Sequence, residues 1–191
     1  MFYTCWAKGG AGTLCLATTK DPTASSADGS APGWTRHGPA FPGAHKSGAL
    51  LIRDSLPHYL ISGAGSIHIA QSDNLLNWTL GPLFIDETLW GNPHVEAGPP
   101  PMRLTDGNYV FFHNSWGGAG VPPPGYQPAW VILDGKDPSK ILARAPESLF
   151  TPTDEPWMEG RSPYSCNVPQ VAFLEAAHPA GGDQFRASQR A

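Results

Sequence analysis

The chain has 191 residues, a formal net charge of −4 and a composition that is 40% hydrophobic and 15% charged. These values are typical of a globular protein, and a small acidic excess without any lysine or arginine cluster argues against nucleic acid or an anionic membrane as a partner. The 22 glycines and 21 prolines fall between short apolar runs, which predicts an all-β fold with many turns. No apolar run is long enough for a membrane span, and no export signal is visible. The sequence indicates neither the compartment nor the oligomeric state.

A unit of strands closed by an aspartate turn recurs along the chain. We expect its strands at residues 2–6 and 13–19 in the first copy, at 47–52, 58–62 and 66–72 in the second, and at 101–104, 109–113 and 130–134 in the third. A fourth copy begins at Val168 and stops after Phe185, and the first copy lacks its opening strand. The turn aspartates Asp21, Asp73 and Asp137 are 52 and 64 residues apart, the period expected of four-stranded propeller blades with loop insertions.

The loops that lead into the innermost strands of a propeller form one rim of its central channel. Lys46, Glu96 and Asn167 each precede such a strand, and His113 lies on the adjacent strand, so we expect these four residues to converge on one central channel. Glu96 stands before residues 98–101, whose three prolines cannot lie inside a central strand and are expected to lead into a strand at Met102. The alternative is a surface glutamate beside a stiff loop.

The three cysteines, Cys5, Cys15 and Cys166, match neither a zinc site nor a disulfide framework in their spacing. We expect Cys5 and Cys15 to pack in apolar strands as small hydrophobic side chains. The sequence implies no metal or organic cofactor. Seven tryptophans and five tyrosines suit a carbohydrate-binding face as well as a core, and Trp90 and Trp116, beside the rim loops, are compatible with both.

Four segments, in this order, resemble glycoside hydrolase family 130, a family of β-mannoside phosphorylases and β-mannosidases with a five-bladed propeller. They are HVEAGPPPM at 94–102, TDGNYVFFHNSW at 105–116, YQPAWVILDGKDPSKILAR at 126–144 and CNVPQVAF at 166–173. The resemblance implies an all-β, five-bladed β-propeller of which residues 1–191, one partial domain, hold about three to four blades.

The same resemblance assigns candidate substrate-binding residues. His113 matches a strand-borne histidine near the anion or the sugar, although a core histidine is the alternative, and Tyr126 matches the tyrosine that opens the next strand. His94 stands where phosphorylases carry a phosphate-contacting lysine, and Lys46 stands near an arginine for the same anion. A second arginine is replaced by Ser62-Gly63. Because a phosphate favours guanidinium forks, these differences favour water over phosphate as the attacking group.

The expected function is hydrolysis of β-linked, mannose-containing oligosaccharides with inversion, which needs a proton donor and a base. Glu96 is the catalytic candidate, and Asn167 joins the sugar-binding set. The resemblance places the proton-donating aspartate ahead of Met1, so whether this chain is itself an enzyme stays open. The alternatives are a non-catalytic sugar-binding or structural propeller and, third, a β-mannoside phosphorylase.

Overall fold

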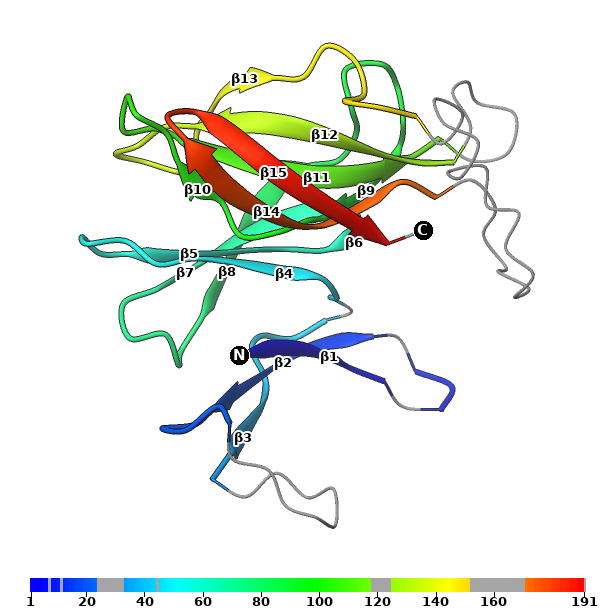
Figure 1. Ribbon diagram of the computed structural model, residues 1–191. Coiled ribbons are helices and arrows are strands. Elements are labelled where there is room, and N and C mark those ends of the chain that lie inside the picture. The colour runs from blue at the N-terminus through cyan, green and yellow to red at the C-terminus, as the bar shows by residue number, and fades with distance from the viewer. Residues whose placement is uncertain are drawn as a thin grey trace.

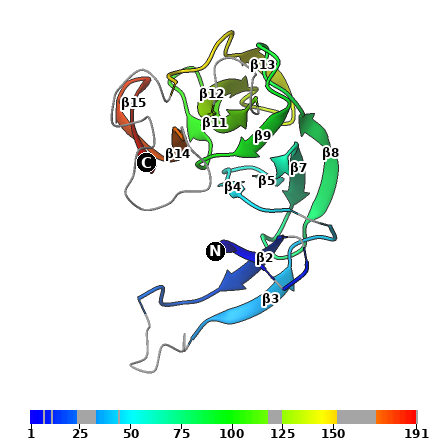
Figure 2. The same ribbon diagram turned by 90° about the vertical axis from the view of Figure 1, so that its right-hand side faces the viewer.

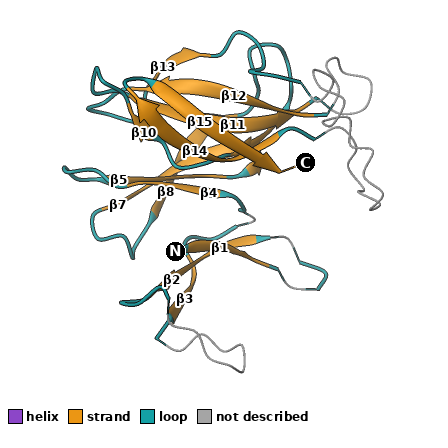
Figure 3. Ribbon diagram, in the orientation of Figure 1, coloured by secondary structure: helices purple, strands orange, loops and turns teal. Residues whose placement is uncertain are grey.

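The computed structural model describes residues 1–6, 8–10, 12–23, 33–43, 45–117, 125–151 and 171–190, the last four without their side chains. Within these ranges the chain forms fifteen strands in four sheets and no helix. Figure 3 shows the described chain coloured as strand and loop throughout. The predicted all-β class is confirmed. The described residues accordingly include no helix long and apolar enough to cross a membrane.

The four sheets follow the chain in order. The first contains β1 (Phe2–Cys5), β2 (Thr13–Thr18) and β3 (Thr35–Pro39). The second contains β4 (Gly48–Leu51), β5 (His58–Ser62), β7 (Ile67–Ser72) and β8 (Thr79–Ile85). The third contains β13 (Ile141–Arg144), β12 (Tyr126–Leu133), β11 (Tyr109–Trp116), β9 (His94–Ala97) and β6 (Ala64–Gly65), with β10 (Met102–Arg103) also on β11. The fourth contains β14 (Phe173–Gly181) and β15 (Gln184–Arg190).

The sheets are stacked face to face along an arc (Figures 1 and 2). In Figure 2 the first sheet lies at one end of the arc and the β14–β15 hairpin at the other, with the second and third sheets between them. Neighbouring strands pair antiparallel within every sheet. This is the blade arrangement that the repeat predicts, with strand ranges close to the expected ones in the second and third copies.

The second sheet is buried on both faces because its strands alternate between two apolar cores. Tyr59 and Ile61 of β5 belong to the core shared with the third sheet, which includes Phe111. Leu60, between them, belongs to the core shared with the first sheet, which includes Leu14. Side chains on successive residues of a strand point to opposite faces. Burying each large apolar side chain contributes roughly 1.5–3 kcal/mol, so these cores hold the sheets in their stack.

The inner strand of the third sheet is interrupted. β9 and β10 both pair with β11, Ala97 lying opposite His113 and Met102 opposite Val110, and residues 98–101 bulge out between them. The prolines explain the break, since they have no N–H for the ladder. Glu96 therefore lies inside a strand, not in the loop ahead of it as expected from the sequence, because residues 94–97 find partners on β11.

The expectation for the first two cysteines is wrong. Cys5 ends β1 and Cys15 lies in β2, and the two form a disulfide with their Cα atoms 6.1 Å apart. Spacing alone does not reveal this pair, because the bridge depends on how the two strands of the hairpin are aligned. Cys166 lies outside the described residues.

Candidate functional site

Most of the candidate residues lie at one rim of the sheet stack. At this rim lie the β1–β2 hairpin, the segment before β4, the two-residue strand β6, and the β11 and β12 ends that face each other, which appear on the right of Figure 1. Lys46 precedes β4, Glu96 lies in β9, and His94 and Tyr126 begin β9 and β12. The structure therefore places four of the six predicted site residues at one rim.

Lys46 and Glu96 form an ion pair, with Lys46 Nζ 3.3 Å from Glu96 Oε1. Ser47 Oγ donates a 2.6 Å hydrogen bond to the same oxygen. Only 5% of Glu96 is exposed, so these two contacts hold a nearly buried carboxylate at a fixed place. Both contacts use the same carboxylate oxygen, Oε1.

Gly63 joins the two sheets at this ion pair. Its N–H donates to the carbonyl of Lys46 at 3.0 Å, and its carbonyl accepts from the N–H of Ala97 at 3.1 Å. Gly63 has φ +144°, and a Cβ there would lie 2.0 Å from the carbonyl oxygen of Ser66. Only glycine fits at this position. The resemblance aligns a family arginine with Ser62-Gly63, and an arginine at position 63 would not fit this backbone.

Aromatic rings surround His94. Its Nε2 lies 3.4 Å from the Tyr126 hydroxyl, and its ring meets those of Trp116 and Tyr126 edge to face, both with centroids 6.1 Å away. Burial lowers the pKa of His94, an effect that Lys46 adds to and Glu96 opposes. Burial, followed by the charge of Glu96, raises the pKa of Tyr126. Both groups are thus neutral at neutral pH and can exchange hydrogen bonds with hydroxyl groups.

His113 is not brought together with Glu96. In the antiparallel ladder Glu96 lies opposite Asn114, and His113 lies opposite Ala97. Residues directly opposite share a face and neighbours alternate, so Glu96 and His113 lie on opposite faces of the sheet. His113 is only 3% exposed, and burial lowers its pKa to about 4. It is a neutral interior histidine, which matches the alternative weighed for it.

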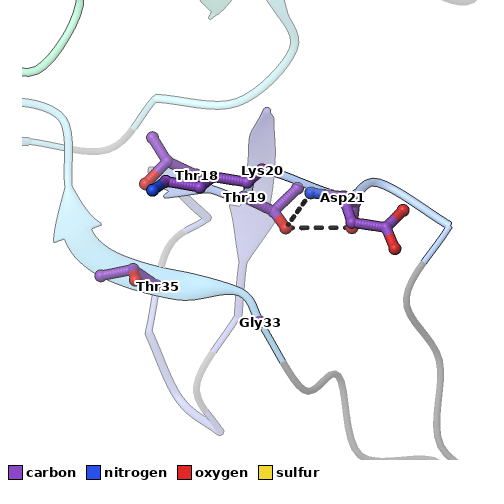
Figure 4. A pocket seen from close by; sticks show the side chains of 6 residues that line it. All are labelled: Thr18, Thr19, Lys20, Asp21, Gly33 and Thr35. Atoms are coloured by element: carbon purple, nitrogen blue, oxygen red, sulfur yellow. Dashed lines mark hydrogen bonds between the residues drawn. The ribbon is translucent and has the colours of Figure 1, made fainter.

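The last candidate residue and one surface pocket lie away from the described part of this rim. Asn167 lies outside the described residues. A pocket of about 450 Å³ lies at the far end of β2, where Thr19 Oγ1 and Asp21 exchange hydrogen bonds across the aspartate turn, as shown in Figure 4. It is at the opposite rim from Glu96. The described residues contain no group of three or more histidine, cysteine or acidic side chains placed to hold a metal ion.

Sequence reasoning missed Ser47 and Asn114. Ser47 adopts φ 55° and is adjacent to a residue already singled out, so its position was a usable signal. Asn114 is fully buried, and its side chain bonds to the backbone of Leu174 in the fourth sheet. No local signal marks Asn114, because its partner lies 60 residues away.

Comparison with known proteins defines the fold as a five-bladed β-propeller, of which this chain comprises a part. The family model described as beta-1,4-mannooligosaccharide phosphorylase matches residues 8–168. The chain therefore belongs to glycoside hydrolase family 130.

Three relatives illustrate the similarity. A 1,2-beta-oligomannan phosphorylase from Thermoanaerobacter sp. (strain X514) is 29% identical over 146 residues, covering 73% of this chain and 44% of the relative. A glycosyl hydrolase from Bacteroides ovatus superposes with a TM-score of 0.69 at 24% identity, covering 93% of this chain and 54% of that structure. The beta-1,2-mannobiose phosphorylase of Listeria innocua superposes at 0.73 with 17% identity, covering 96% and 49%. The chain spans about half the length of these relatives.

Proposed function

We propose that this chain forms part of a hydrolase that cleaves β-linked, mannose-containing oligosaccharides with inversion, and that Glu96 is the base that activates water. Membership of family 130 supports the mannoside substrate. The observation that favours water over phosphate as the attacking group is the Lys46–Glu96 ion pair. The cation that an incoming phosphate would need is already neutralised by a carboxylate.

The electrostatics of the rim support water as the acceptor. A phosphate ion is bound best by charged forks of arginine or by several cations. Lys46 and Glu96 together carry no net charge, and the lowered pKa of His94 keeps its imidazole neutral. A water molecule needs no cation, whereas it does need a nearby carboxylate to accept its proton.

Each rim residue has a role in this proposal. Lys46 and Ser47 fix the carboxylate of Glu96 through Oε1, so that the other oxygen can take the proton from water. His94 and Tyr126 donate and accept hydrogen bonds at sugar hydroxyls. These assignments concern the base and the sugar-binding residues.

The sharpest test uses 2,4-dinitrophenyl β-mannoside, whose leaving group departs without a proton donor and so isolates the role of the base. We expect free mannose, released first as the α-anomer, at a rate that does not change when phosphate is added. Glu96→Gln should lower this rate by about 10²- to 10⁴-fold. The exposed Glu175 provides a matched control, and Glu175→Gln should leave the rate unchanged.

Phosphorolysis is the second candidate, favoured by the description of the family model and by the Thermoanaerobacter relative. Mannose 1-phosphate as the main product in phosphate buffer would establish it and overturn hydrolysis. Binding of mannobiose without any turnover of the activated mannoside would instead support a sugar-binding propeller. β-1,2- and β-1,4-mannobiose, the linkages named for the relative and for the family model, should be compared in parallel.

A further inference from the structure

Two tryptophans stand out among the exposed apolar side chains of the described residues. Trp6 is 72% exposed and Trp116 is 38% exposed, whereas the other large apolar side chains with comparable exposure are aliphatic. Trp6 directly follows β1 and Trp116 ends β11. Both therefore stand where a hairpin turns at the rim that carries Lys46 and Glu96.

Trp6 lies on the face of the β1–β2 hairpin that is turned toward the second sheet, because it follows the alternation of Phe2 and Thr4. The ring of Phe2 meets that of Trp78, which directly precedes β8 of the second sheet, with the ring centroids 5.5 Å apart. A Cβ at Gly12 would lie 3.5 Å from Cε3 of Trp6. The glycine therefore lets one edge of the indole rest on the hairpin while the rest of the ring faces solvent.

Trp116 ends β11 and shares the strand face of Asn114, whose side chain bonds to the fourth sheet. It lies opposite both His94 and Tyr126 in the ladders of β11. Its indole stacks on the Tyr126 ring at 6.1 Å with an interplanar angle of 16°, and His94 abuts it edge to face. Along the arc of sheets, Trp6 belongs to the first sheet, Lys46 precedes the first strand of the second, and Glu96 and Trp116 belong to the third.

We propose that Trp6 and Trp116 are stacking platforms for sugar rings on either side of the unit held at Lys46 and Glu96. This inference rests on the proposed function and extends it, because it assigns binding positions for an oligosaccharide of at least three units. One face of a pyranose ring presents C–H groups, and an indole is the side chain that offers the largest flat apolar surface to them. Sugar binding also removes apolar area of both tryptophans from water.

The test is binding of manno-oligosaccharides of two to five units to the full chain, measured by calorimetry. We expect Trp6→Ala to weaken binding of the tetraose by about 3- to 10-fold, the effect of losing one ring-stacking contact, and to change mannobiose binding by less than 2-fold. Trp6→Phe, which keeps a ring, should recover most of the loss. Trp116→Ala should weaken binding of the tetraose by a similar factor.

Ile52 provides the control, since it is 60% exposed and follows β4 at the opposite rim. Ile52→Ala should bind every oligosaccharide like the unmodified chain, and circular dichroism should show that all variants keep the β fold. Tetraose binding that is equal in Trp6→Ala and the unmodified chain overturns this inference alone. An unmodified chain that binds no manno-oligosaccharide overturns the proposed function together with it.

Discussion

The side-chain amide of Asn114 pairs with the backbone of Leu174 as a neighbouring strand would. The N–H of Leu174 donates to Asn114 Oδ1 at 2.7 Å, and Asn114 Nδ2 donates to the carbonyl of Leu174 at 3.2 Å. Both residues are buried, at 0% and 1% exposure. One side chain thus satisfies both polar backbone groups of a residue in the next sheet and ties β11 to β14.

Asn114→Ala should destabilise the protein by roughly 2–4 kcal/mol, because it leaves two buried backbone groups of Leu174 without partners. Denaturant unfolding measures the total, and faster hydrogen exchange at the Leu174 amide locates it. Asn77 is exposed, so Asn77→Ala is the matched control. Equal stability of the two variants would contradict the bridging role of Asn114.

Gly63→Ala should cost at least about 3 kcal/mol, since the new Cβ would meet the Ser66 carbonyl oxygen at 2.0 Å and strain a backbone at φ +144°. Gly91 also has positive φ, +89°, but its Cβ would meet nothing within 4 Å. Gly91→Ala should therefore cost only about 1–2 kcal/mol from its backbone conformation. If the two variants melt together, the close approach at Gly63 is not what requires glycine.

His113 makes stability fall with acid. Burial lowers its pKa to about 4 from an ordinary value of 6.5, so between these pH values the unfolded chain takes up a proton that the native state excludes. Stability should therefore drop as the pH falls from 6.5 to 4, by roughly 3 kcal/mol in total. His113→Gln should flatten this dependence, whereas replacement of the exposed His178 should leave it intact.

The Lys46–Glu96 pair should show strong non-additivity. Lys46→Met leaves a carboxylate whose side chain is only 7% exposed without its cation, at an expected cost of about 1–2 kcal/mol. The double variant Lys46→Met with Glu96→Gln removes the stranded charge and should be more stable than Lys46→Met alone. A double-mutant cycle by chemical denaturation measures the coupling, and simple additivity would show that the ion pair contributes nothing.

The blade pattern could be predicted because it depends on local signals. Apolar alternation and the turns at Asp73 and Asp137 mark strands within a few residues, and register then places Lys46 and Glu96 at one rim. Whether Glu96 and His113 lie on the same face of the sheet could not be predicted. A shift of one residue in the pairing of β9 with β11 would move every side chain of β9 to the other face. The Asn114 bridge could not be predicted for a related reason, since it depends on how the third and fourth sheets pack against each other.

The two-residue strand β6 affects how the second and third sheets unfold. It follows the second sheet along the chain, yet Ala64 and Gly65 pair with Glu96 and Val95 of the third. Repeats that touch through side chains alone can open one at a time. Here main-chain bonds cross the boundary, so we expect the second and third sheets to open together in hydrogen exchange. A protease cut in the loop between β8 and β9 would break the polypeptide and leave these two sheets joined.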